Sequence, residues 1–166
     1  TDLAVGNMTA WSYWTAMAQE KWSQKNRFYL LRLNAKGDSG PESYGDLKNG
    51  GTVAADKNLW TLGNYSRFIR PGYKRVAVEG TDELNGLMCS AYISPDGKQT
   101  VCVFVNMSKE KRTVNLSLLN TETGSFKKYV TNITTNLKLD NSDSQLSSLS
   151  LTARSVTTLV IDNASD

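Results

Sequence analysis

The stretch "LGNYSRFIRPGYKRV", residues 62–76, decides the fold of this 166-residue chain, because a helical pattern ends in it and a strand pattern begins. Apolar side chains before its proline recur at the spacing of one helical face: Leu59, Leu62, Tyr65 or Ser66, and Ile69. Asp56 precedes this pattern as a candidate N-cap. Pro71 disfavours helical geometry in the residue before it. The stretch therefore predicts a helix over residues 56–69 and a different kind of structure after it.

Short strand-like runs separated by turn signals follow from Tyr73 onward. They comprise residues 73–79, 86–93, 99–106, 112–118, 125–131, 134–139, 145–151 and 155–161. Short strands at this spacing are typical of an antiparallel β-sandwich. The runs "TVCVFV" (100–105) and "SVTTLVI" (155–161) are the richest in β-branched residues, so we expect them at the centre of the sheet.

The part of the chain before the helix has a different organisation. Residues 8–17, "MTAWSYWTAM", lack polar alternation and predict a strand buried on both sides, although a helix also fits so short an apolar run. Residues 27–33, "RFYLLRL", predict another strand. Residues 34–51 are rich in Gly, Ser and Asp and predict a long loop, which usually borders a functional surface or is disordered.

The two cysteines lie on either side of the turn at Pro95-Asp96-Gly97. A hairpin with the four-residue loop 94–97 would place Ile93 opposite Lys98 and Cys89 opposite Cys102. Opposed residues of an antiparallel pair lie about 4.5–5.5 Å apart, which is bridging distance. A disulfide and two small buried thiols on one face of the hairpin both remain open.

Composition excludes several function classes. The net charge is only +3 and the basic residues are dispersed, which argues against a nucleic-acid partner. The chain has no histidine, so Ser-His-Asp and Cys-His nucleophile systems and the commonest zinc ligand are absent. No Cys or acidic cluster has metal-ligand spacing, so we expect no metal and no cofactor. No apolar run approaches the length of a membrane span, and the first residues, "TDLAVGNMTAW", contain no signal peptide.

Asn-X-Ser/Thr triplets are more frequent than chance predicts. They begin at Asn7, Asn64, Asn106, Asn115, Asn132 and Asn163. Such an excess fits a glycosylated secreted protein. Strands and turns rich in Ser, Thr and Asn in a bacterial exported protein would produce the same triplets, so both readings stay open.

Three segments taken in order resemble the C-terminal portion of glycoside hydrolase family 30: "WSYWTA" (11–16), "KNLWTLGNYSRFIRPGYKRV" (57–76) and "SAYISPDGKQTVCVFVN" (90–106). The resemblance covers nearly the whole chain, and the last 40 residues are its least distinctive part. It implies that residues 1–70 are the C-terminal fragment of a (β/α)8 barrel, with residues 8–17 as the eighth strand and residues 56–69 as the eighth helix. Residues 71–166 would form the β-sandwich side domain. The expected fold is thus mainly β.

The resemblance also implies a chemistry. The family includes glucosylceramidase-like enzymes, glucuronoxylanases and endo-β-1,6-galactanases or glucanases, which retain configuration with two glutamates on the fourth and seventh barrel strands. Both strands would precede Thr1, so this segment holds no catalytic residue and we expect it to be inactive alone. The implied partners are the upstream barrel and a polysaccharide or oligosaccharide, and the implied location is secreted, periplasmic or cell-surface. "WSYW" resembles the β-1,6-galactanase or glucanase branch more than the xylanases.

The candidate sugar-binding residues are Trp14 as the first choice, Trp11 as the second, and Tyr13. The apolar face of a sugar ring stacks on an aromatic ring, and the ends of barrel strands build the active site. The alternative is that these rings belong to the core. Trp22 and the loop 36–51 are weaker candidates for the same cleft.

Residues outside that segment are interpreted structurally. We expect Arg67 and Arg70 to serve as ion pairs or as donors to carbonyl groups. Tyr73, Tyr92 and Tyr129 would offer a sugar-binding face only if exposed, and burial is the preferred interpretation. The alternative function for the whole chain is a non-catalytic carbohydrate-binding or structural β-sandwich module.

Overall fold

The computed structural model describes residues 2–3, 6–19, 29–36, 47–81, 85–119 and 123–164, and the chain is mainly β. It forms two compact units, Thr1–Trp60 and Thr61–Asp166, and the division between them falls within the sequence of helix α1 (Lys57–Ser66). The predicted assignment of residues 1–70 to a barrel and of residues 71–166 to a sandwich domain stays a prediction. None of the described helices is long and apolar enough to cross a membrane.

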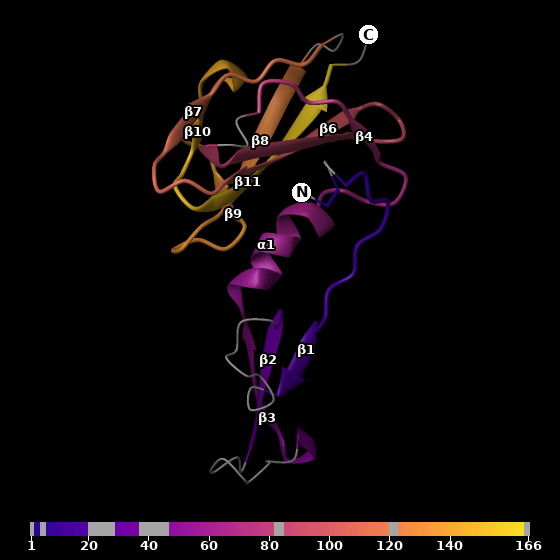
Figure 1. Cartoon of the computed structure of the whole chain (residues 1–166). Helices are drawn as coiled ribbons and strands as arrows, with labels where there is room; N and C mark the ends of the chain where they lie inside the picture. Colours follow the sequence, from indigo (N-terminus) through magenta and orange to yellow (C-terminus); the bar gives the residue numbers. More distant parts are fainter. Residues whose placement is uncertain are drawn as a thin grey trace. The chain divides into compact units, whose positions relative to one another are not determined.

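The first unit contains a small sheet of order β1-β2-β3 in its described part (Figure 1). Its strands are β1 (Met17–Gln19), β2 (Leu31–Ala35) and β3 (Gly51–Ala55), preceded by the short helix η2 (Leu47–Asn49). Strand β1 runs parallel to β2, and β3 runs antiparallel to it. At the start of β3 a Cβ on Gly51 would lie 2.3 Å from the carbonyl oxygen of Asn34, so only glycine fits there.

Two predictions for the first unit were wrong. Of the strand predicted over residues 8–17, only Met17 lies in a strand, and the chain from Asn7 to Ala16 is irregular. The expected burial on both sides does not occur, because Trp11 and Trp14 are exposed. The predicted loop over residues 34–51 was wrong at its ends, because β2 extends to Ala35 and pairs with β3, which begins at Gly51. Residues 37–46 of that loop lie outside the described residues.

The predicted helix is confirmed as α1, residues Lys57–Ser66. Turns continue from its end to Ile69, and the amide of Tyr73 donates to the carbonyl of Arg70 across Pro71 and Gly72. Gly72 has φ of 94°, in the left-handed region that favours glycine. The Pro-Gly pair therefore ends the helical stretch and turns the chain into the sandwich.

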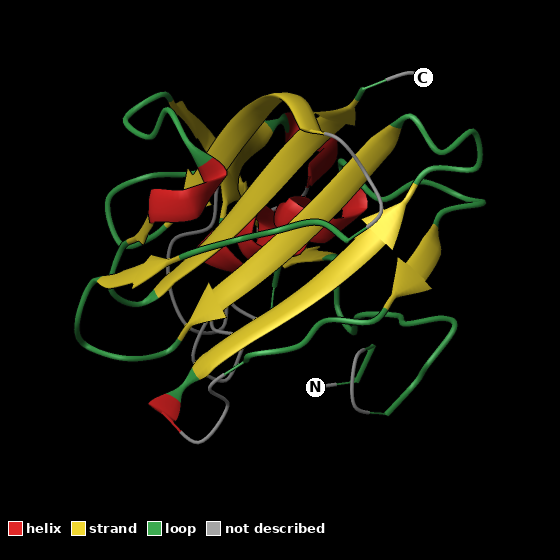
Figure 2. Ribbon diagram, turned by 90° about the horizontal axis from the view of Figure 1, so that it is seen from above, coloured by secondary structure: helices red, strands yellow, loops and turns green. Residues whose placement is uncertain are grey.

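The described part of the second unit is an antiparallel six-stranded sheet of order β4-β5-β6-β11-β8-β9 with a two-stranded sheet β10-β7 against it. Figure 2 shows the long strands side by side. The strands of the large sheet are β4 (Lys74–Val76), β5 (Leu87–Ile93), β6 (Gln99–Asn106), β8 (Thr123–Thr131), β9 (Lys138–Asp140) and β11 (Ser155–Asn163). Those of the small sheet are β7 (Arg112–Val114) and β10 (Leu149–Leu151), the latter preceded by the short helix η4 (Leu146–Ser148). The predicted β-sandwich and its central runs, β6 and β11, are confirmed.

Both faces of the central strands are covered, because side chains alternate between the faces of a strand. On one face, Cys102, Phe104 and Leu159 pack with Leu149 and Leu151 of β10. On the opposite face the core consists of Val101, Val103 and Val156, with residues of α1 and of the turn after it packed against it: Tyr65, Phe68 and Ile69. The large sheet thus separates two hydrophobic cores.

Asn64 of α1 has no exposed surface and anchors the helix to two strands. Its Nδ2 donates to Thr131 Oγ1 of β8 at 2.8 Å. The hydroxyl of Thr158 in β11 lies 2.8 Å from the Asn64 main-chain oxygen and 2.9 Å from its side-chain oxygen, and donates to them. Thr131 Oγ1 also accepts from the amide of Leu137. These bonds satisfy polar groups that burial would otherwise make unfavourable.

The predicted register of the β5–β6 hairpin was wrong by two residues. Ile93 pairs with Thr100, and Cys102 pairs with Ala91 rather than with Cys89. Ser94 closes the hairpin instead of lying in the loop: its amide donates to the carbonyl of Gln99, and its hydroxyl accepts from the Gln99 amide. The loop is therefore residues 95–98. Cys89 and Cys102 share a face as diagonal neighbours and are both free thiols.

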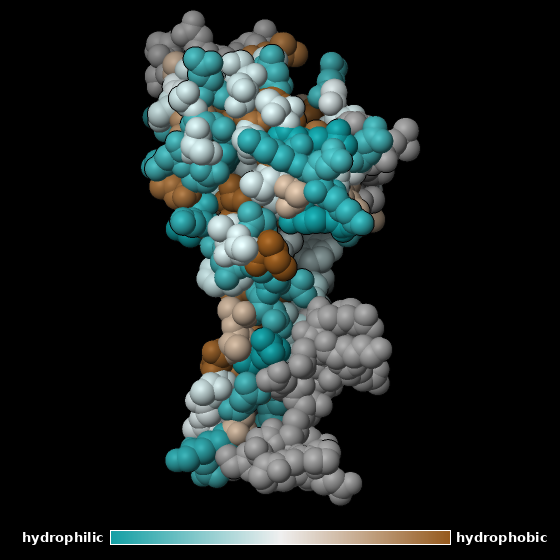
Figure 3. Space-filling model, turned by 90° about the vertical axis from the view of Figure 1, so that its left-hand side faces the viewer, coloured by the Kyte–Doolittle hydropathy of each residue, from teal (hydrophilic) through white to brown (hydrophobic). Residues whose placement is uncertain are grey.

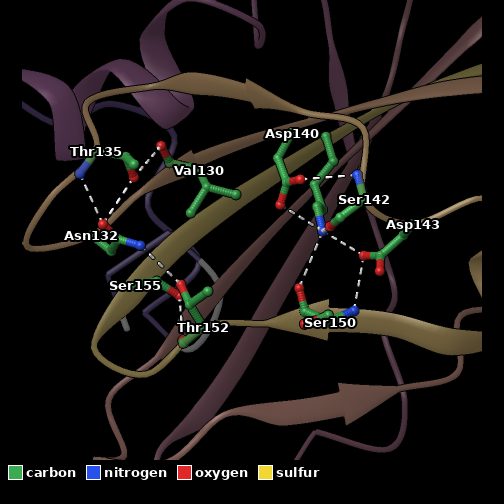
Figure 4. Close-up of polar contacts among 10 residues, drawn as sticks. Val130, Asn132, Thr135, Asp140, Ser142, Asp143, Ser150, Thr152 and Ser155 are labelled. Carbon is green, nitrogen blue, oxygen red and sulfur yellow. Dashed lines mark hydrogen bonds and ion pairs between the residues drawn. The ribbon is translucent and has the colours of Figure 1, made fainter.

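Lys128 of β8 is a buried cation, 1% exposed, although the sequence presents it as half of a basic pair. Its ammonium group lies 3.0 Å from Asp140 Oδ2, contacts Asp143 Oδ2, and donates to Ser142 Oγ at 3.2 Å. Figure 4 shows Asp140, Ser142, Asp143 and Ser150 converging on one point. Asp143 also accepts from the amide of Ser150 in β10. The network thus links β8 and β9 of the large sheet to the small sheet.

Replacing Lys128 with Met should lower the free energy of unfolding by about 3–5 kcal/mol, because the substitution leaves Asp143 and Asp140 without their cation. Urea denaturation measures the effect. The matched control is Lys127→Met at the neighbouring exposed position, where we expect a change below about 0.5 kcal/mol. Equal unfolding midpoints for the two variants would show that the network does not stabilise the sandwich.

Stability should also fall at acid pH through Asp140. Burial acts to raise the pKa of this carboxyl, but hydrogen bonds from Lys128 and from Ser142 outweigh burial and lower the pKa below its ordinary value. The stabilisation is therefore present above the unfolded pKa of about 3.9 and disappears as the pH falls through the lower folded value. Urea midpoints measured between about pH 5 and pH 2.5 should fall more steeply for the wild type than for Asp140→Asn. Parallel curves would contradict this role.

The two thiols should be unreactive in the folded protein. Burial raises the pKa of Cys102 to about 12, and burial together with the nearby Cys102 raises the pKa of Cys89. Because the thiolate is the reactive form, a thiol reagent at about pH 8 should label the native chain slowly. Unfolding in urea without a reductant should expose both thiols to rapid labelling. A chain that shows no free thiol after unfolding would instead contain a disulfide.

Candidate functional site

The predicted sugar-binding residues lie together in the irregular segment before β1. The Trp14 side chain is 90% exposed, Trp11 is 48% exposed, and Tyr13 is half-buried. Trp14 is therefore not a core residue of the described first unit. Its role as a sugar contact stays a prediction, since exposure alone does not identify a ligand.

Side-chain contacts hold two of the three rings. The Trp11 and Tyr13 ring centroids lie 5.7 Å apart with an interplanar angle of 40°. The Trp11 indole Nε1 donates to Asp2 Oδ2 at 3.2 Å, and Asn58 Nδ2 in the first turn of α1 donates to the Tyr13 hydroxyl at 3.3 Å. The Trp14–Thr15 peptide bond is cis.

The end of this segment is fixed by the backbone. The carbonyl oxygen of Ala16 accepts hydrogen bonds from the amides of Leu30 and Leu31 at the start of β2. Arg32 Nε of β2 lies 3.0 Å from Oδ2 of Asp56, the residue immediately before α1. Hydrogen bonds and an ion pair thus join β1, β2 and the start of α1 around the aromatic segment.

Other candidates for the same cleft lie largely outside the described residues. These are Trp22 and residues 37–46 of the predicted loop. Of the six glutamates of the chain, the structure describes Glu79 and Glu110, and both are exposed in the second unit. The described residues contain no group of three or more Cys, Asp or Glu side chains suited to a metal ion.

Arg67 and Arg70 have structural contacts, as predicted for the helix-to-sandwich junction. Arg70 donates to the main-chain carbonyl of Ser66 at 2.8 Å. The Arg67 guanidinium lies 5.6 Å from the Phe68 ring centroid and 5.9 Å from that of Tyr129. Phe68 and Tyr129 are themselves 4.6 Å apart, so among the described residues Arg67 covers an aromatic pair, which differs from the expected ion pair or carbonyl contact.

The tyrosines of the sandwich are used in packing. Tyr92 is 6% exposed, which confirms its predicted burial. Tyr73 packs against the core formed by Val101 and its neighbours, and its hydroxyl donates to Gln99 Oε1 at 2.8 Å. Burial raises the pKa of Tyr65, which lies in the same layer and accepts a hydrogen bond from Ser90. In the view of Figure 3, hydrophobic residues form separate small areas among hydrophilic ones.

Most Asn-X-Ser/Thr triplets have a structural explanation. Asn106 Oδ1 accepts from the amide and the hydroxyl of Ser108, and Asn132 Oδ1 accepts from the same two groups of Thr134. This arrangement is an Asx turn reinforced by the hydroxyl two residues later. Figure 4 shows Asn132 between Thr135 and Thr152, to which its amide groups also bond.

The remaining triplets differ in exposure. Asn64 is fully buried, and Asn163 is held by Thr100 and by the carbonyl of Gly97. Asn7 and Asn115 are exposed. The excess of triplets therefore reflects turns and helix anchoring at several positions and is weak support for glycosylation.

Comparison with known proteins matches residues 72–159 to the glycosyl hydrolase family 30 β-sandwich domain. A glucuronoxylanase of Bacillus subtilis (strain 168) is 31% identical over 96 residues, which are 58% of this chain and 22% of that enzyme. The crystal structure of a conserved exported protein from Bacteroides fragilis has a TM-score of 0.77 and 35% identity, and the match covers 96% of this chain and 31% of that one.

A family 30 subfamily 8 xylanase of Clostridium acetobutylicum is also similar, with a TM-score of 0.60, 26% identity and coverage of 72% of this chain and 30% of that one. The chain thus spans less than a third of the length of each of these relatives. The family domain covers more than half of the chain and coincides with the sheets of the second unit. The chain therefore belongs to glycosyl hydrolase family 30, and its second unit contains the family's β-sandwich domain.

Proposed function

We propose that this chain is the C-terminal segment of a secreted, retaining glycoside hydrolase that acts on a β-linked polysaccharide. Residues 71–166 brace a catalytic (β/α)8 barrel, and residues 1–70 contribute its last strand and helix. The match of residues 72–159 to the family 30 side domain carries this proposal. Two matches cover 96% and 72% of this chain but less than a third of each relative, which supports the presence of a barrel before it.

Catalysis in this proposal belongs to two glutamates upstream of Thr1. A retaining enzyme needs its nucleophile and its acid/base carboxyl about 5–5.5 Å apart on either side of the glycosidic bond. Glu79 and Glu110, the glutamates that the structure describes, lie exposed in the sandwich unit. The contribution of this chain is to hold the barrel and to supply an aromatic contact for the sugar.

Trp14 is the residue of this chain that contacts the substrate in our proposal. Its exposed indole offers an apolar face to the C–H face of a sugar ring, while the hydroxyl groups of the sugar stay free for hydrogen bonds. The named relatives are a glucuronoxylanase and a xylanase, which favours xylan. The resemblance of "WSYW" favours β-1,6-galactan or β-1,6-glucan. An exported relative supports secretion.

The proposal predicts that the chain alone is inactive and that the chain joined to its upstream barrel hydrolyses one of these β-linked polysaccharides. The activities of the chain alone and of the joined protein are measured by the release of reducing sugar. The substrates are glucuronoxylan, unsubstituted xylan, β-1,6-galactan and β-1,6-glucan. Trp14→Ala in the joined protein should lower kcat/KM about 10-fold, because the bound sugar ring loses its apolar contact with the indole. The control is Ile133→Ala, which removes an equally exposed apolar side chain from the sandwich and should leave kcat/KM unchanged.

Two results would reject the proposal. Hydrolysis by the chain alone would place a catalytic pair within it. Binding of polysaccharide by the chain, with no hydrolysis by the joined protein, would identify the alternative, a carbohydrate-binding module without catalysis.

A further inference from the structure

The aromatic segment owes its conformation to side chains. Residues 7–16 belong to no strand or helix. Among the described residues, their hydrogen bonds to other backbone groups lie at the two ends of the segment, at Met8 and Ala16. Between these ends lie the three aromatic rings. The orientation of Trp14 therefore depends on what holds its neighbours.

Trp11 and Tyr13 hold the segment from one side. Their ring centroids lie 5.7 Å apart, so the two rings contact each other across Ser12. Tyr13 directly precedes Trp14, so the contacts of Tyr13 hold the backbone from which the Trp14 side chain, 90% exposed, extends.

The two anchored rings have partners at their polar ends. The Trp11 N–H group is engaged by the Asp2 carboxylate, and the Tyr13 hydroxyl accepts from Asn58 in the first turn of α1. Asn58 is a fixed point because it belongs to a regular helix. Trp14, by contrast, presents nearly its whole ring surface.

We propose that Tyr13 is a positioning residue: its contacts with Asn58 and Trp11 hold the Trp14 indole outward for an apolar sugar face. The inference rests on the proposed function for the ligand, but the positioning itself is a property of this chain. It divides the three candidate residues into one sugar contact, Trp14, and two that support it. Tyr13 acts through the backbone it shares with Trp14 and does not touch the sugar.

The first test uses the 166-residue chain labelled with 5-fluorotryptophan and needs no substrate. Trp14→Phe assigns the Trp14 line among the four tryptophans in the fluorine NMR spectrum. We expect Tyr13→Phe to shift or broaden the Trp14 line, and Asn58→Ala to do the same. The control is Tyr73→Phe, which removes one phenol hydrogen bond in the sandwich, of 2.8 Å to Gln99, and should leave the Trp14 line unchanged. A Trp14 line that is the same in Tyr13→Phe and wild type would overturn the inference.

The second test measures hydrolysis of the preferred polysaccharide by the joined protein. Tyr13→Phe should raise KM about 3- to 10-fold with little change in kcat, the size of effect that one neutral hydrogen bond produces. Asn58→Ala should raise KM similarly, and the double variant should show no further rise, because both changes break the same contact. Additive effects, or a wild-type KM in Tyr13→Phe, would reject the positioning role.

The two proposals fail differently. If Trp14→Ala leaves catalysis unchanged, the proposed sugar contact is wrong, and the fluorine spectrum still decides whether Tyr13 positions Trp14. If Trp14→Ala impairs catalysis while Tyr13→Phe changes neither KM nor the Trp14 line, the sugar contact stands and the positioning role is wrong.

Discussion

A single buried amide fixes the helix to the sheet, and the arrangement of the second unit depends on that contact. Asn64 bonds to Thr131 and Thr158, which lie on the neighbouring strands β8 and β11. A buried amide without partners is strongly unfavourable, so the helix has one acceptable position along these strands. This position places Tyr65, Phe68 and Ile69 over the valines of the central strands. The same contact therefore determines where the hydrophobic cover lies.

The opposite face of the sheet is closed by a polar network around Lys128. A cation at this depth is tolerated only when opposite charges and hydrogen-bond acceptors surround it. Asp140 and Asp143 provide the charges, and Ser142 and Ser150 complete the site. Because these groups come from both sheets of the sandwich, the network specifies how the two sheets are matched.

The first unit has a different character. Its sheet is short, and its aromatic segment is held by contacts between side chains. Such a segment presents the Trp14 ring to solvent instead of burying it. Single exposed apolar side chains are common on protein surfaces, so this exposure makes the indole accessible and leaves its ligand to the proposed function.

The sequence by itself determined the order of the elements and the family. Helix α1 and the central strands β6 and β11 follow directly from the periodicity of apolar residues, from the Pro71–Gly72 stop signal and from runs of β-branched residues, all of which act within a few neighbouring positions. The predicted sandwich followed from the regular spacing of such runs. The candidate aromatic residues were also visible in the sequence, because the "WSYW" segment contains three large rings.

Only the tertiary structure decided register, burial and the use of polar groups. The loop sequence did not reveal that the Ser94 hydroxyl closes the β5–β6 hairpin. The cross-strand partners predicted for Cys89 and Cys102 were therefore wrong by two residues. The burial of Lys128 depends on Asp140 and Asp143, which come to it from another part of the chain. The hydrogen bond between Asn58 and Tyr13 likewise joins residues that are far apart in sequence. In each case the deciding atoms belong to elements that come together only on folding, and local sequence patterns carry no information about them.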